Sequence, residues 1–245
     1  MSMHALIPCA GSGARLQGDV PKQYRQLAGA AVVAHTVRAF LACPQVALVH
    51  VVVQAGDAQA RAVLPAHPRL RIHEAGGAAR AQTVLQGLRG LQAQGAGEQD
   101  WVLVHDAARC CITPQAIAGL IEACQHDAVG GLLALPLPDT LKQAAADANA
   151  PQTMRVAATL PRDGLWLAQT PQMFRLGILL AALQQSDPAG ITDEASAVER
   201  MGLRPKLVLG SGSNFKVTFA DDLILAEALI TTRAQHAATP GAEHA

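Results

Sequence analysis

The sequence predicts an α/β fold built on a mostly parallel central sheet. Apolar runs of strand length alternate along the chain with segments whose apolar residues recur at helical spacing, as in strand–helix–strand units. The run at 46–53 is apolar except for His50, which is typical of a strand that is buried on both faces. A chain of 245 residues fits one large domain of this class or two small ones.

The expected elements alternate regularly up to Pro136. Strands are expected at 4–9, 46–53, 101–105 and 129–135. Helices are expected around three sets of apolar residues at helical spacing: Val33, Val37, Phe40 and Leu41; Val84, Leu85, Leu88 and Leu91; and Ile117, Leu120, Ile121 and Cys124. Because helices separate these strands, most of them are expected to run parallel.

The pattern changes after Pro136. The stretch 138–161 is Ala-rich and lacks long apolar periodicity, so we expect it to leave the core as a loop or an extended arm. Helices are then expected at 176–183, 192–201 and 221–233, and a pair of strands at 207–209 and 214–217. Thr218, followed by Asp221 and Asp222, marks the start of the last helix. The end of the chain, 236–245, is expected to be disordered.

Composition excludes several classes of protein. Lys plus Arg and Asp plus Glu total 19 each, so the formal net charge is zero, which argues against a nucleic-acid partner. The hydrophobic share of 50% and the charged share of 16% exclude a disordered chain. No apolar run approaches the roughly 18 residues of a membrane span. The five cysteines contain no CxxC pair, as in reduced thiols of a cytoplasmic protein.

A glycine-containing loop at 8–16 follows the first expected strand. Its small residues let backbone N–H groups approach an anion closely. The dinucleotide fingerprint fails because Leu16 stands where it needs Gly or Ala, and the Walker A pattern fails because Asp19 stands where it needs Lys. Arg15 and Lys22 supply two cations that suit a triphosphate, although a tight turn with two solvated charges explains the same spacing.

The chain resembles, beyond this loop, the nucleotidyltransferase family that makes CDP-linked polyols. The family signature P-A-A-G-x-G-x-R, followed by P-K-Q-[YF], is matched between Pro8 and Tyr24 with one departure, Cys9 in place of Ala. Cys is small, so the backbone cradle is expected to survive. Further stretches resemble elements of the same family in the same order: 76–84, 104–109, 138–142 with 161–166, 192–195 and 214–218. The resemblance spans about residues 4–230.

The resemblance implies a particular organisation of the chain. It implies a single Rossmann-like three-layer domain over 1–235, with a mostly parallel central sheet and an extended arm for dimerisation at about 137–163. Such an arm crosses to the neighbouring subunit, so a homodimer with composite active sites is implied. The remainder, 236–245, would be a disordered tail.

The implied reaction joins CTP and a polyol phosphate to give a CDP-polyol and pyrophosphate. The leading acceptor is 2-C-methyl-D-erythritol 4-phosphate, of the non-mevalonate isoprenoid pathway, and the alternative is another polyol phosphate such as ribitol 5-phosphate. The nucleophile is a phosphate oxygen with a second pKa of about 6, so it needs no general base at pH 7. It needs positioning and charge stabilisation, to which Mg²⁺ bound mainly through the CTP phosphates would contribute. The sequence does not indicate which residues bind the metal.

The resemblance also implies residue roles. The catalytic residues would be Arg15, Lys22, Arg162 and Lys216. CTP would be bound by Ala10, Gly11, Ser12, Gly13, Gly77, Ala78 and Thr83, with the backbone at 77 and 78 reading the cytosine edge. The acceptor would be bound by Asp106, Arg109, Thr140, Thr170 and Thr192. Many relatives carry an acidic residue at 78, so Ala78 weakens base selectivity if that side chain matters.

Several of these residues also have a purely structural interpretation. Lys216 could protect an edge strand, Asp106 could close its strand in an Asx turn, and the hydroxyls of Thr170 and Thr192 could cap helices or turns. Arg162 and Thr140 could belong to an ordinary polar loop.

Two other classes of protein remain as alternatives. A dinucleotide-dependent oxidoreductase is disfavoured by Leu16 in place of the third glycine. A catalytically dead nucleotide-binding regulator is disfavoured by the retention of Arg15, Lys22 and Lys216 together.

Overall fold

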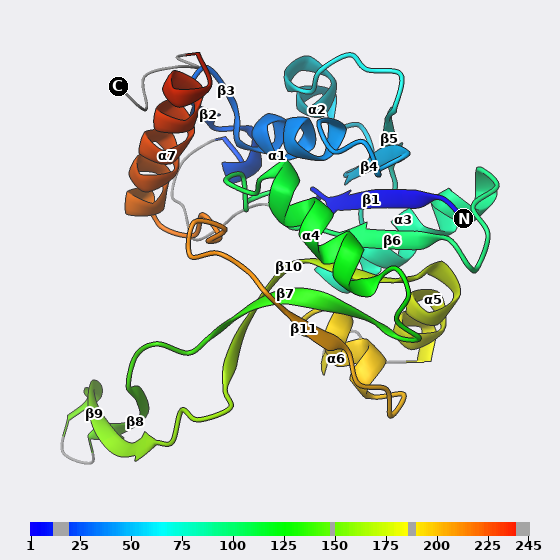
Figure 1. The fold of residues 1–245 in the computed structure, drawn as a ribbon. Coiled ribbons are helices and arrows are strands. Elements are labelled where there is room, and N and C mark those ends of the chain that lie inside the picture. Colours follow the sequence, from blue (N-terminus) through cyan, green and yellow to red (C-terminus); the bar gives the residue numbers. More distant parts are fainter. Residues whose placement is uncertain (12–19, 148–149, 186–189, 239–245) are drawn as a thin grey trace, which may run out of the picture.

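The computed structural model describes residues 1–11, 20–147, 150–185 and 190–238. Its centre is a seven-stranded sheet in the order β11-β7-β10-β6-β1-β4-β5 (Figure 1). The strands are β1 (Met3–Pro8), β4 (Leu48–Val53), β5 (Leu70–Glu74), β6 (Trp101–Val104), β7 (Gly130–Pro136), β10 (Trp166–Arg175) and β11 (Lys206–Leu209). The β10 strand runs antiparallel to both of its neighbours, and the other ladders are parallel. The predicted α/β fold with a mostly parallel sheet is therefore confirmed.

Helices cover both faces of this sheet and make three layers. The helices are α1 (Val32–Leu41), α2 (Ala58–Val63), α3 (Arg80–Ala93), α4 (Pro114–Cys124), α5 (Leu176–Gln185), α6 (Glu194–Glu199) and α7 (Ala220–Ala238). Ala5 and Ile7 of β1 pack in one core with α1 and α4, whereas Leu6 packs in a second core with α3, α5 and α6. Successive strand residues point to opposite faces, so a strand between two helical layers is apolar throughout.

The smaller elements lie before α1. A short 3-10 helix, η1 (Lys22–Tyr24), precedes a pair of two-residue strands, β2 (Gln26–Leu27) and β3 (Ala30–Ala31). The Tyr24 hydroxyl donates to Asp57 Oδ2 at 2.5 Å. Asp57 also accepts from the Ala60 N–H at the start of α2, so this one carboxylate links η1 to a helix N-terminus.

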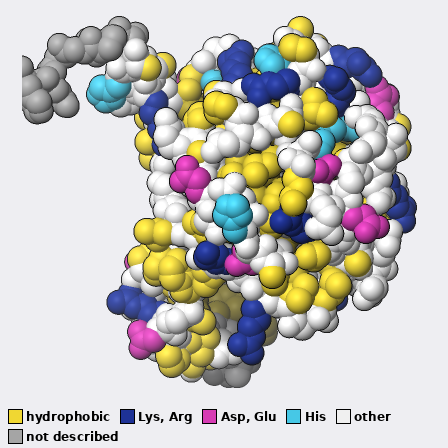
Figure 2. All heavy atoms as spheres, turned by 45° about the vertical axis from the view of Figure 1, so that its right-hand side comes forward, with side chains coloured by type: hydrophobic (Ala, Val, Ile, Leu, Met, Phe, Trp, Pro, Cys, Tyr) yellow, Lys and Arg dark blue, Asp and Glu magenta, His cyan; other side chains and the backbone are white. Residues whose placement is uncertain are grey.

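The segment 138–161 leaves the core, as the sequence predicts. It forms an antiparallel hairpin of β8 (Leu141–Asp147) and β9 (Ala150–Leu160), which projects away from the central sheet (Figure 1). Met154 and Val156 on β9 are more than 60% exposed, and hydrophobic side chains show on this projection at the bottom of Figure 2. The arm therefore presents apolar surface that its own chain does not cover.

Some elements differ from the sequence-based expectations. No strand forms at 214–217: Val217 N–H donates to Ala108 O, and the segment runs in an irregular path. The β10, β5 and α2 elements were not expected. The last helix continues to Ala238, past the predicted end at Arg233 and into the segment predicted to be disordered, and the rest of that segment lies outside the described residues.

The start of the last helix depends on Asp222 rather than on Asp221. Its carboxylate accepts from the backbone N–H groups of Thr218 and Phe219 at 2.7 and 2.8 Å.

None of the helices that the structure describes is long and apolar enough to span a bilayer.

Gly130 lies where β7 pairs with β10, and its surroundings predict that a larger residue there would destabilise the fold. Its φ is +112°, and a Cβ there would collide with the carbonyl oxygen of Met173 on the neighbouring strand. We expect Gly130→Ala to lower the free energy of unfolding by about 2 kcal/mol or more, because backbone strain and overpacking add. Denaturant unfolding measures this.

The matched control is Gly95→Ala. Gly95 has a φ of +93° but open space around the added Cβ, so this variant carries the backbone strain without the collision. An equal loss in both variants would contradict the assigned role of the Met173 contact.

Candidate active site

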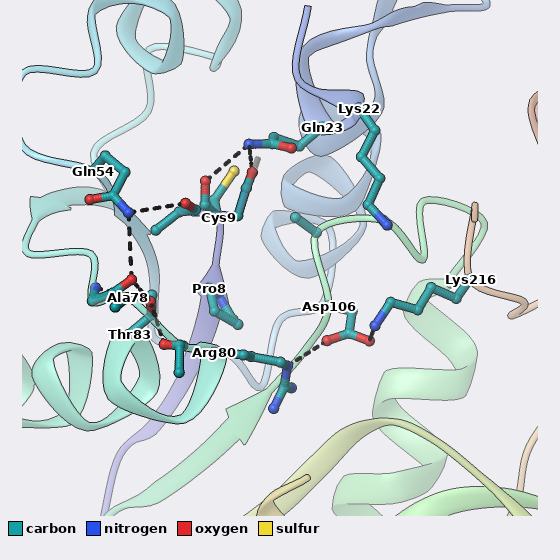
Figure 3. A pocket seen from close by; sticks show the side chains of 16 residues that line it. Pro8, Cys9, Lys22, Gln23, Gln54, Ala78, Arg80, Thr83, Asp106 and Lys216 are labelled. Carbon is teal, nitrogen blue, oxygen red and sulfur yellow. Dashed lines mark hydrogen bonds and ion pairs between the residues drawn. The ribbon is translucent and has the colours of Figure 1, made fainter. Parts of the chain in front are cut away.

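A cavity of about 420 Å³ opens at the carboxyl ends of β1 and β6, beside the N-terminus of α3 (Figure 3). This is the edge at which open α/β sheets bind ligands. Among its lining residues are eight that the sequence analysis singled out: Ala10, Gly11, Lys22, Gly77, Ala78, Thr83, Asp106 and Lys216. The chain thus brings together residues that lie up to about 200 positions apart in the sequence, since Lys216 reaches the same cavity as Ala10.

One side of the cavity is built from backbone groups. Thr83 Oγ1 accepts from the Gly77 N–H at 3.1 Å and donates to Ala79 O at 3.2 Å, which fixes the turn before α3. Gln54 Nε2 donates to Ala10 O at 3.1 Å and to Gly77 O at 3.5 Å, so it joins the two loops that flank this side. Polar backbone groups held in this way suit recognition of the edge of a base, and the methyl group of Ala78 adds no hydrogen bond.

The opposite side of the cavity carries two lysines. Figure 3 shows the amino groups of Lys22 and Lys216 pointing into the same region, across the cavity from Ala78 and Thr83. Lys22 Nζ donates to Val217 O at 3.1 Å, and Lys216 Nζ lies 2.9 Å from Asp106 Oδ2. Two ammonium groups beside a glycine loop make this side suitable for phosphates.

The segment that carries Lys22 is fastened to the glycine loop. The neighbouring side chain, Gln23, is buried, and its Nε2 donates to Gly11 O at 2.8 Å and to Cys9 O at 3.3 Å. The position of Lys22 is therefore tied to the described end of that loop. Ser12, Gly13 and Arg15 lie outside the described residues, so their predicted roles remain predictions.

Asp106 is the buried centre of the site. It is 8% exposed, and cations approach it from three sides: Arg80 Nε at 2.9 Å, Lys216 Nζ at 2.9 Å and Arg109 Nε at 3.6 Å. Burial acts to raise the pKa of this carboxyl, but Arg80, Lys216 and Arg109 outweigh it and hold the pKa well below its usual range. Asp106 is therefore ionised and acts as an acceptor and counter-charge, not as a proton donor.

Two predicted acceptor-binding residues lie behind Asp106. Thr170 Oγ1 accepts from the Asp106 N–H at 3.1 Å and lies 3.0 Å from His105 Nδ1. Burial lowers the pKa of His105 to about 4, so the ring is neutral at pH 7. Arg109 donates to Asn214 O at 2.8 Å, which ties the strand end to the segment that carries Lys216. Within one chain, Thr170 and Arg109 therefore both help to hold Asp106 and its surroundings in place.

Three other predicted residues lie away from this cavity in the single chain. Arg162 and Thr140 are exposed on the arm, where Arg162 donates to Pro138 O. Thr192 is exposed just before α6, and its N–H donates to Ser196 Oγ at 3.2 Å.

Arg80 and Glu194 are not among the predicted site residues, but the structure places them in one cluster with Asp106. Arg80 Nη1 and Nη2 donate to the two carboxylate oxygens of Glu194 at 2.6 and 3.0 Å, while its Nε holds Asp106. A sequence signal was available for both, because Arg80 lies in the stretch 76–84 and Glu194 in the stretch 192–195, which resemble motifs of the family.

The described residues do not form a metal site of protein ligands. They contain no group of three or more His, Cys, Asp or Glu side chains that could hold an ion. Both oxygens of Asp106 are already paired with cations.

The fold and the cavity together define a class of protein. A Rossmann-like sheet whose carboxyl edge carries fixed backbone groups opposite two lysines suits a nucleotidyltransferase. The family model described as "IspD: 2-C-methyl-D-erythritol 4-phosphate cytidylyltransferase" matches residues 3–232, and the chain belongs to this family.

The relatives agree with this assignment. The "2-C-methyl-D-erythritol 4-phosphate cytidylyltransferase" of Chromobacterium violaceum is 50% identical over 234 residues, covering 96% of this chain and 100% of the relative. The "Bifunctional enzyme IspD/IspF" of Albidiferax ferrireducens is 54% identical over 236 residues, covering 96% of this chain but only 54% of that enzyme. A crystal structure of "4-diphosphocytidyl-2C-methyl-D-erythritol synthase" is 42% identical, with a TM-score of 0.80 over 94% of this chain and 98% of that one.

The depressed pKa of Asp106 predicts a pH dependence of stability. A carboxyl whose folded-state pKa lies below its unfolded value of about 4 adds stability above that pH, and the contribution is lost as pH falls further. We expect the difference in free energy of unfolding between the wild type and Asp106→Asn to be largest near neutral pH and to shrink below about pH 4. Urea titrations from pH 7 to pH 3 measure it, and a difference that stays constant over this range would contradict the ion pairing.

Proposed function

We propose that this chain transfers CMP from CTP to 2-C-methyl-D-erythritol 4-phosphate, giving 4-diphosphocytidyl-2-C-methyl-D-erythritol and pyrophosphate. The observation that carries the proposal is the cavity itself, in which a backbone loop held by Thr83 faces Lys22 and Lys216. The first group of contacts suits a nucleotide base, and the second suits two phosphates that must be brought together. The names of the relatives supply the identity of the acceptor.

The site residues fit a reaction driven by positioning. The acceptor phosphate is mostly dianionic at pH 7, so its oxygen attacks the α-phosphorus of CTP without a protein base, and the bond to the pyrophosphate leaving group breaks. Two anions that repel each other must be held in line, and Lys22 and Lys216 supply the counter-charge. Arg15 is proposed to act with Lys22 on the triphosphate.

The cofactor, assembly and location are part of the proposal. Mg²⁺ would be bound through the CTP phosphates. The chain would act in the cytoplasm, in keeping with its five free cysteines, all buried. A homodimer is supported by the exposed apolar residues of the arm and by Arg162 and Thr140, which lie on that arm away from the cavity of their own chain. The arm of the partner would then complete the site for the acceptor phosphate.

The direct test is pyrophosphate release from CTP and Mg²⁺, with 2-C-methyl-D-erythritol 4-phosphate and ribitol 5-phosphate assayed side by side. Release with the first and not with the second supports the proposal. Release with ribitol 5-phosphate alone would preserve the mechanism but overturn the acceptor. Release with neither would overturn the proposed function.

Lys22 gives a mutational prediction. Lys22→Ala, and likewise Arg15→Ala, should lower turnover by on the order of 10²–10³, as is typical when one donor to a developing charge is removed. Steady-state pyrophosphate release measures the effect. Lys206→Ala is the matched control, because that lysine is exposed on β11 and donates to Ala123 O, outside the cavity. Lys22→Ala turning over like Lys206→Ala would remove Lys22 from the mechanism.

The composite site predicts that two defective variants complement each other. Lys22→Ala damages the cavity, and Arg162→Ala damages the arm. In a mixed dimer one site combines an intact cavity with an intact arm, so we expect about half of the wild-type turnover from it. Differently tagged subunits allow the mixed dimer to be purified and assayed. Mixed dimers no more active than the two parents would contradict sites shared between subunits.

A further inference from the structure

We propose that Glu194 is a positioning residue for this reaction: by occupying the fork of Arg80, it keeps one oxygen of Asp106 available to orient Lys216 toward the acceptor phosphate. This inference rests on the proposed function. Glu194 does not line the cavity, so it acts through Arg80 and Asp106 and not by touching substrate.

Arg80 is shared between two buried acids. Its Nε donates to Asp106 Oδ1 at 2.9 Å, and its two terminal nitrogens donate to the two oxygens of Glu194 at 2.6 and 3.0 Å. A bidentate Arg–carboxylate pair has strict geometry, so Glu194 fixes the plane of the guanidinium as well as its charge. Only the Nε of Arg80 therefore contacts Asp106. The second carboxylate oxygen, Oδ2, remains for Lys216 at 2.9 Å.

Glu194 is itself firmly placed. It is 1% exposed at the first position of α6, and Asp193 caps that helix by accepting from the Ser196 N–H at 2.9 Å. Gln172 of β10 fixes the same helix end, because its Nε2 donates to Asp193 Oδ2 at 2.8 Å and its Oε1 accepts from the Ala195 N–H at 2.7 Å. A rigid contact path therefore runs from the sheet to α6, and from α6 through Arg80 to Asp106.

The charges explain why the second acid matters. Three cations, Arg80, Arg109 and Lys216, meet the two carboxylates of Asp106 and Glu194, so the cluster keeps one excess positive charge near the cavity. Without the charge of Glu194, the two terminal nitrogens of Arg80 would be free to bind both oxygens of Asp106. Such a bidentate pair is stronger than the single contact that Nε makes with Asp106. Lys216 would then lose the partner that orients it.

The test is the isosteric variant Glu194→Gln. We expect kcat/KM for the polyol phosphate to fall on the order of 10–100-fold, as when a reacting group is misplaced by about 1 Å. The equilibrium dissociation constant for CTP, measured by calorimetry without acceptor, should stay within about twofold, because Thr83 and the Gly77 turn keep their contacts. The matched control is Glu74→Gln, which breaks an exposed Arg–Glu pair with Arg61, and neither of these two residues lines the cavity. It should behave as the wild type.

A double variant tests whether Arg80 competes with Lys216 for Asp106 when Glu194 is absent. Replacing both members of a buried ion pair with apolar residues restores much of the stability lost when one member is removed. We therefore expect Arg80→Met with Glu194→Met to melt closer to the wild type than Glu194→Met alone. Its kcat/KM for the acceptor should also recover in part, because no guanidinium is left at position 80 to take Asp106 Oδ2 from Lys216. A kcat/KM that stays as low as in Glu194→Met, although the melting temperature recovers, would overturn the proposal.

The remaining outcomes are distinguishable. A wild type that is inactive with the polyol phosphate would overturn the proposed function itself. An active wild type with Glu194→Gln indistinguishable from Glu74→Gln would overturn the positioning role alone. A loss of CTP affinity as large as the loss of acceptor efficiency would also overturn it, because the effect would then not be confined to Lys216.

Discussion

The buried carboxylate of Asp106 organises the whole site. Removing an ionised carboxylate from water costs several kcal/mol unless cations and hydrogen bonds compensate for it. Here the compensation comes from the start of α3, from the turn that contains Arg109 and from the segment that contains Lys216. Because the three elements are far apart in the chain, satisfying this one charge also assembles the wall of the cavity. The cations are then already held where phosphates would enter.

The antiparallel strand β10 supplies polar side chains that hold the segments around Asp106 in place. Its pairing with β7 is interrupted between Ala168 and Gln172, and such an irregularity re-aims side chains. Thr170 then accepts from the Asp106 N–H, while Gln172 holds the start of α6. A strand that carries buried polar residues needs partners for each of them. In this protein those partners are the loops that carry the functional groups, so the strand is part of the site as well as of the sheet.

The two sides of the cavity differ in charge. One side is neutral and consists of backbone held by Thr83 and Gln54, which suits the proposed binding of a base. The other side is cationic, and its lysines are kept in place by Val217 O and by Asp106, which suits the proposed binding of phosphates. His105 is neutral and Asp106 is ionised, in keeping with a proposed reaction that needs no protein acid or base.

The sequence determined the parts of this protein that depend on local pattern. Apolar runs such as 46–53 identified the strands buried on both faces, and helical spacing identified the helices between them, because each pattern follows from burial of one face or two. Motif order gave the family and most of the cavity residues. The apolar pattern did not predict β10, because its buried Gln169, Thr170 and Gln172 are polar and are not typical of a core strand. It also predicted a strand at 214–217, where the chain instead follows an irregular path.

Contacts between distant segments were decided by tertiary packing. No local pattern shows that Glu194 meets Arg80, 114 positions away, or that Lys216 reaches Asp106. These pairs form because the parallel strands end at one edge of the sheet and bring their loops together, and because a carboxylate buried there must find a cation. Sequence pattern therefore specified which chemical groups this protein uses, and long-range charge compensation specified how they face one another.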